Sequence, residues 1–151
     1  MSAPSLPYHS KAWLLDGPID SLPGVLSFDG TRLRFLALEA GTFPRAKLRR
    51  TFETCGQTWT EGNEPEWPYA LIDVTRAEVR AFHIPWYYFG GGAVIDLGHG
   101  PMRFSFIRPQ NTVFPSHYSE HLQQWVGGEG QEEVDIPEGK LAGKRWRALL
   151  T

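Results

Sequence analysis

The sequence lacks the features that mark disulfide-bonded, secreted or membrane-spanning proteins. Its 151 residues include a single cysteine, Cys55, which has no partner for an internal disulfide. The N-terminal residues have neither the basic start nor the continuous apolar stretch of a signal peptide. No segment approaches the roughly 20 apolar residues that a membrane-spanning helix needs. These absences predict a cytoplasmic protein that reaches a membrane, if at all, only from its surface.

An excess of positive charge and the usual serine-nucleophile and phosphate-binding motifs are also lacking. Fifteen Lys and Arg against 17 Asp and Glu give a net charge of -2, so nucleic acid is not an expected partner. No G-x-S-x-G nucleophile turn is present. The triplet Gly90–Gly92 precedes a strand-like run, whereas a phosphate loop precedes a helix, and it therefore predicts a turn. No cofactor is expected, and any anion site must be local.

Aromatic residues, by contrast, are plentiful and favour β-structure. The chain has six Trp, nine Phe and five Tyr, and 41% of its residues are hydrophobic. One domain of this length can bury about 70% of its unfolded surface. Seven apolar-rich runs, separated by Gly, Pro and Asp, predict antiparallel strands. They are 12–15, the two runs of the hairpin GVLSFDGTRLRFLAL around Asp29-Gly30, 69–73, EVRAFHI, AVIDL and MRFSFIR.

Two helices are predicted from apolar spacing. Phe43 to Cys55 lies between the third and fourth strands, with a loop to about residue 67. Val113 to Val126 has an apolar stripe and is expected to close one end of a barrel made of two orthogonal sheets. The stripe comprises Phe114, Tyr118, Leu122 and Trp125. The predicted organisation is a domain over 1–126, an acidic linker over 127–139 and a short basic amphipathic helix over 140–151.

The order of seven strands and a helix resembles the pleckstrin-homology-like superfold, in its GRAM-like branch. The similar segments are GVLSFDGTRLRF, ALIDVTRAEVRAF, FGGGAVIDL and MRFSFIRP, between about Pro23 and Pro109. The resemblance implies a mainly β fold with α-helix, a seven-stranded partly open barrel capped by a helix, with an additional inserted helix. It also implies a non-catalytic module that binds lipid headgroups or proteins. No lipid-contacting residue is implied, because the first hairpin turn lacks basic residues.

Binding residues are predicted in two places. On a helical projection Lys140, Lys144 and Arg147 lie within about 60°, opposite Trp146, so the last helix could attract an anionic surface and anchor to it through Trp146. Docking of this helix on the barrel through Trp146 and Leu149 explains the same pattern and is the favoured interpretation of its packing. Trp86 and Tyr87 belong to a run of four aromatic residues that cannot all face one core. The predicted partner is a protein or an anionic membrane surface, and self-association is a further option.

One motif supports a different function. His117-Tyr118-Ser119-Glu120-His121 matches H-x-x-E-H, in which two helical histidines bind zinc and the glutamate acts as a base. No third protein ligand is evident, and histidines flanking the apolar stripe of a capping helix explain the pattern more simply. A small metal-dependent hydrolase that uses His117, Glu120 and His121 is therefore the alternative to a binding module.

Overall fold

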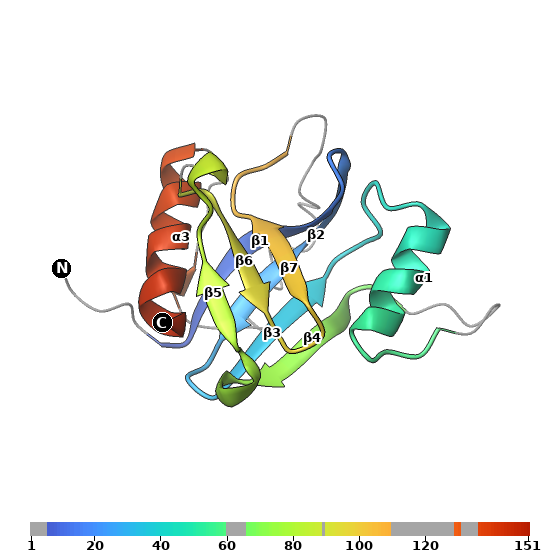
Figure 1. Cartoon of the computed structure of the whole chain (residues 1–151), viewed down its shortest axis with the longest axis horizontal. Helices are drawn as coiled ribbons and strands as arrows, with labels where there is room; N and C mark the ends of the chain where they lie inside the picture. The colour runs from blue at the N-terminus through green and yellow to red at the C-terminus, as the bar shows by residue number, and fades with distance from the viewer. Residues whose placement is uncertain (1–5, 60–65, 89, 110–128, 131–135) are drawn as a thin grey trace.

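The architecture is described here from a computed structural model of the chain. The structure describes residues 6–59, 66–88, 90–109, 129–130 and 136–151. Two helices, α1 (Arg45–Thr54) and α3 (Ile136–Leu150), lie on opposite sides of a group of strands (Figure 1). The predicted capping helix at Val113–Val126 lies outside the described residues, as do His117, Glu120 and His121.

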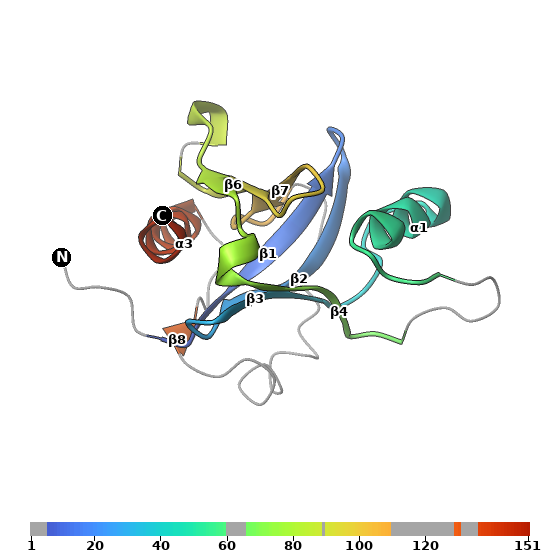
Figure 2. The ribbon, with the colours of Figure 1, turned by 60° about the horizontal axis from the view of Figure 1, so that its bottom comes forward.

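Seven antiparallel strands form one sheet in the order β4-β3-β2-β1-β7-β6-β5. A two-residue strand, β8, pairs in parallel with the start of β1. The sheet curves into a partly open barrel (Figure 2), with β4 and β5 at its two edges. The strands are β1 (Tyr8–Asp16), β2 (Asp20–Phe28), β3 (Arg32–Ala37), β4 (Tyr69–Thr75), β5 (Ala81–His83), β6 (Gly92–Asp96), β7 (Pro101–Ser105) and β8 (Glu129–Gly130).

The seven predicted strands are confirmed, although they form one continuous sheet where two separate sheets were expected. Side chains alternate between the two faces of the sheet, and every second side chain at the ends of β2 and β3 that meet in the hairpin lies in the main core. Leu26 pairs with Phe35 and Phe28 with Leu33 in the register of this hairpin. All four side chains belong to the main core.

The inserted helix α1 (Arg45–Thr54) follows β3 and precedes β4. It begins after Pro44, at Arg45 where Phe43 was predicted, because the backbone of Pro44 is extended, with a ψ of 153°. Its buried side chains are Leu48 and Phe52, four residues apart. Lys47 ties the helix to the β1–β2 turn, with its Nζ atom 2.6 Å from a carboxylate oxygen of Asp20.

The C-terminal helix α3 (Ile136–Leu150) is longer than predicted and is part of the fold. It begins at Ile136, within the segment expected to be an acidic linker, and Pro137 is suited to its first turn. The helix packs against β5 and β6. Its buried residues include Ala142, Trp146 and Leu150, which recur every four residues.

The position of Trp146 contradicts the prediction that this side chain is an exposed anchor for a membrane or partner. Its side chain is fully buried, and its indole N–H donates a hydrogen bond to the hydroxyl oxygen of Ser10 at 2.7 Å. Its ring also packs edge-on against Tyr8, with 5.1 Å between ring centroids. The apolar face of α3 covers the barrel because burying an indole inside the protein removes a large apolar surface from water. The structure therefore shows the docking that was favoured for this helix on sequence grounds.

Candidate functional site

The outer face of α3 carries the three basic residues that the sequence singled out. Lys140, Lys144 and Arg147 are all exposed, on the side of the helix away from its buried face. Within the described part of the chain, none of the three side chains forms an ion pair or a hydrogen bond. Leu141 lies among them and is 41% exposed.

These residues line a groove between α3 and the chain that leaves β5, which we call the basic groove. Its volume is about 460 Å³, and it is lined by Ile84, Gly90, Lys140, Leu141, Lys144 and Arg147. Ile84 and Gly90 supply the opposite wall, since Ile84 follows β5 and Gly90 precedes β6. The groove therefore has an apolar wall at Ile84 and, along the helix, a row of positive charges that no carboxylate of the described residues pairs with.

Close approach of α3 to this wall depends on glycine. A Cβ atom added to Gly143 would lie 2.1 Å from the carbonyl oxygen of Gly90, and one added to Gly139 would lie 2.3 Å from Ile107. Such distances are far below van der Waals contact. Both glycines are unfavourable in a helix, by roughly 1 kcal/mol each relative to alanine. Their presence is explained by the contact that they permit between the helix and the strands.

The residues between the two wall positions form an aromatic turn, Trp86–Tyr88 (η2). Pro85 begins it, and the amide of Tyr88 donates a hydrogen bond to the Pro85 carbonyl oxygen at 3.0 Å. Gly90 ends it with a positive φ of 86°, which confirms the turn predicted from the glycine triplet. The aromatic turn follows β5 and projects away from the strands (Figure 2).

Two side chains of the aromatic turn are open to solvent. Trp86 is 81% exposed and Tyr87 is 51% exposed. Their rings contact each other edge-on, with centroids 5.8 Å apart. Exposed Trp and Tyr are typical of partner surfaces and of membrane interfaces, where one side of the ring is apolar and the polar edge stays hydrated.

Five of the six predicted binding residues are exposed, either in the basic groove or in the turn that continues its opposite wall, and the sixth is buried. Lys140, Lys144 and Arg147 line the basic groove, and the aromatic turn joins its opposite wall. Trp146 instead lies in the core. Sequence reasoning missed Leu141 and Ile84, whose apolar side chains complete the groove; the position of Leu141 within the basic stripe was the available signal.

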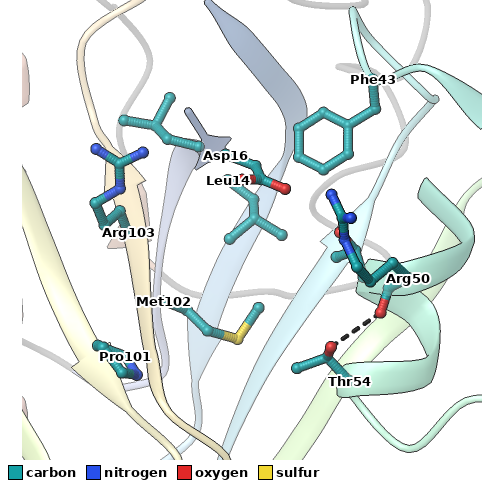
Figure 3. Close-up of a pocket in the computed structure, with 10 residues that line it drawn as sticks. Leu14, Asp16, Phe43, Arg50, Thr54, Pro101, Met102 and Arg103 are labelled. Atoms are coloured by element: carbon teal, nitrogen blue, oxygen red, sulfur yellow. Dashed lines mark hydrogen bonds between the residues drawn. The ribbon is translucent and has the colours of Figure 1, made fainter. Parts of the chain in front are cut away.

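A second hollow lies on the other side of the molecule, between α1 and the ends of β1 and β7. Its volume is about 250 Å³. We call it the α1 groove (Figure 3). It is lined by Leu14, Leu15, Asp16, Phe43, Arg50, Thr51, Thr54, Pro101, Met102 and Arg103. Neither its location nor its residues were predicted, because they come from three segments that are distant in the sequence.

Metal and thiol chemistry find little support in the described part of the chain. Among residues 6–59, 66–88, 90–109 and the described C-terminal segments, no three His, Cys, Asp or Glu side chains are grouped to hold a metal ion. Burial raises the pKa of the Cys55 thiol to about 11, so it is protonated at neutral pH and a poor nucleophile. No described helix is both long and apolar enough to cross a membrane.

Comparisons with known proteins identify no family. No protein-family model matches this chain, and no curated protein sequence matches it. A function for the chain therefore has to follow from the chemistry of its surface.

Proposed function

We propose that this protein is a non-catalytic binding module, of the pleckstrin-homology-like kind, that binds an anionic membrane surface through the basic groove and the aromatic turn. The observation that supports it most is the row of Lys140, Lys144 and Arg147 along the basic groove, whose opposite wall, at Ile84 and Gly90, flanks the turn that exposes Trp86. Cations attract anionic lipid headgroups from a distance. An exposed indole then enters the interfacial region of the bilayer.

The form of the aromatic turn favours a membrane over an acidic peptide. Trp86 lies on a projecting turn, so it can enter a bilayer without distorting the strands. A peptide bound in the basic groove would contact Ile84 and Leu141 and would leave Trp86 largely in water. An acidic protein segment is therefore the second candidate partner, and the test below separates it from a membrane.

The expected strength of attraction follows from the number of cations. A basic residue near an anionic membrane contributes about 1 kcal/mol, so three contribute about 3 kcal/mol, or roughly two orders of magnitude in affinity. This attraction is screened over about 10 Å at 0.1 M salt. Binding should therefore weaken steeply as the salt concentration rises.

The test is sedimentation of the full chain with vesicles of equimolar phosphatidylserine and phosphatidylcholine. We expect binding to these vesicles and none to vesicles of phosphatidylcholine alone. Replacing Lys140, Lys144 and Arg147 together by Gln should reduce binding by about two orders of magnitude. The melting temperature should stay nearly unchanged, because the three side chains are exposed and form no ion pair with any described residue.

A matched control removes the same charge elsewhere. Arg34, Arg45 and Arg49 are exposed and lie outside this face, so their joint replacement by Gln should leave vesicle binding intact. Equal loss in both variants would mean that only net charge matters and would contradict the proposal. Binding to poly-glutamate without binding to vesicles would assign the face to an acidic protein partner instead.

The hydrolase alternative has a separate test. A zinc enzyme built on His117, Glu120 and His121 would hold stoichiometric metal, measurable by atomic absorption of the purified chain. Under our proposal, His117→Ala leaves both metal content and vesicle binding unchanged. Stoichiometric zinc that is lost in His117→Ala would contradict a purely non-catalytic role.

A further inference from the structure

The α1 groove combines an apolar floor with charged walls. Leu14, Phe43 and Met102 are each at most 9% exposed and form the apolar part of its lining. Arg103 and Arg50 stand on opposite walls with Leu14 and Met102 between them (Figure 3). A molecule that fills this hollow therefore meets hydrocarbon below and guanidinium groups on two sides.

Both walls are held in place before any ligand arrives. Lys47 of α1 donates hydrogen bonds to a carboxylate oxygen of Asp20 at 2.6 Å and to the backbone oxygen of Asp16 at 3.3 Å. On the other wall, the Nη2 atom of Arg103 donates to the carbonyl oxygen of Gly17 at 3.1 Å. The groove is thus preformed, which limits the entropy lost when a ligand binds.

Arg50 is the group in this groove that is open to a ligand. Its side chain is exposed, and within the described residues it makes neither a hydrogen bond nor an ion pair. Its backbone carbonyl accepts a hydrogen bond from the Thr54 hydroxyl at 2.9 Å, the contact dashed in Figure 3. The guanidinium group is consequently free to form charge-assisted hydrogen bonds with an anion.

Charge and size limit the ligand class. Asp16 also lines the groove, so the ionised side chains are two guanidinium groups and one carboxylate, which leaves an excess of positive charge. A volume of about 250 Å³ suits a small molecule and is too small for a folded partner. We propose that the α1 groove binds a small amphipathic carboxylate, with its carboxylate at Arg50 and its apolar part over Leu14 and Met102.

Octanoate is a suitable probe for this site, with octylamine as the cation of similar length. In a ¹H–¹⁵N spectrum of the full chain, octanoate should produce saturable shifts at the amides of Thr51 and Met102. Arg50→Gln should weaken its binding by about tenfold, the effect of losing one charge-assisted hydrogen bond. Thr54→Trp, at an exposed position of the lining, should block the groove. Asp16→Asn should tighten binding, because it removes the carboxylate that opposes the ligand.

Arg49→Gln is the matched control, because Arg49 lies on the same helix but does not line the groove. It should leave octanoate binding unchanged. The proposal is overturned if octylamine binds as tightly as octanoate, if Arg49→Gln and Arg50→Gln weaken binding equally, or if octanoate shifts no amide of the groove. The variant lacking Lys140, Lys144 and Arg147 should still bind octanoate, so this site and the membrane face succeed or fail separately.

Discussion

At the scale of single residues, Trp146 shows how one side chain decides between two uses of a helix. An amphipathic helix with basic residues can lie on a membrane, with its apolar side chains in the lipid. In this protein the apolar side chains are buried within the fold, and Ser10 satisfies the polar N–H of the indole. The basic side chains and Leu141 remain available to an outside partner.

The hydrogen bond between Trp146 and Ser10 can be tested by mutation. Ser10→Ala leaves the buried indole N–H without an acceptor, so the free energy of unfolding should fall by about 1–3 kcal/mol. In a Trp146→Phe background, where the donor is already gone, the same change should cost much less. Urea unfolding of the four proteins measures both effects. Equal costs of Ser10→Ala in the two backgrounds would contradict the contact.

The distance in sequence explains why this contact was not predicted. Trp146 and Ser10 are 136 positions apart, and a helical projection identifies the apolar face of a helix without identifying the surface that it covers. The exposure of Trp86 and Tyr87 was easier to predict, because four consecutive aromatic residues cannot all face one core and the glycines after them mark a turn.

At the scale of elements, strand positions were predictable, whereas the start of α3 and the surface that it covers were not. Leu26 and Phe28 alternate with polar or small residues, as do Leu33 and Phe35, and this period of two identifies strands directly. The first turn of α3 was hidden in an acidic stretch with no apolar period. Its two glycines seemed only to weaken a helix, since the backbone that they approach could not be known from sequence.

Gly143 provides a test of how α3 packs. Alanine normally stabilises a helix by roughly 1 kcal/mol relative to glycine. Here the added methyl group would collide with the carbonyl oxygen of Gly90, 2.1 Å away, and a backbone atom cannot rotate aside. We therefore expect Gly143→Ala to be destabilising, by about 1–3 kcal/mol, the usual cost of overpacking.

Thermal unfolding followed by circular dichroism measures this change. Lys144→Ala, at the exposed neighbouring position, is the control and should shift the melting temperature little. A Gly143→Ala variant that is as stable as the parent, or more stable, would show that α3 does not lie against Gly90.

At the scale of the whole molecule, the two helices define two separate surfaces. The face formed by α3 and the aromatic turn is basic and open, whereas α1 encloses a small groove on the opposite side (Figure 1). Net charge, at -2, gives no hint of either site. The proposal of an anionic partner rests on the local grouping of cations on α3, and not on the overall charge of the chain.

Contact between the α3 face and a membrane can be mapped directly. The measurement is paramagnetic broadening of amide signals of the ¹⁵N-labelled chain by spin-labelled headgroups in nanodiscs of phosphatidylserine and phosphatidylcholine. We predict that broadening is strongest at Trp86 and Tyr87, extends to Lys140 and Lys144, and disappears at high salt or without phosphatidylserine. Broadening centred on α1, or spread evenly over the surface, would contradict the proposed function.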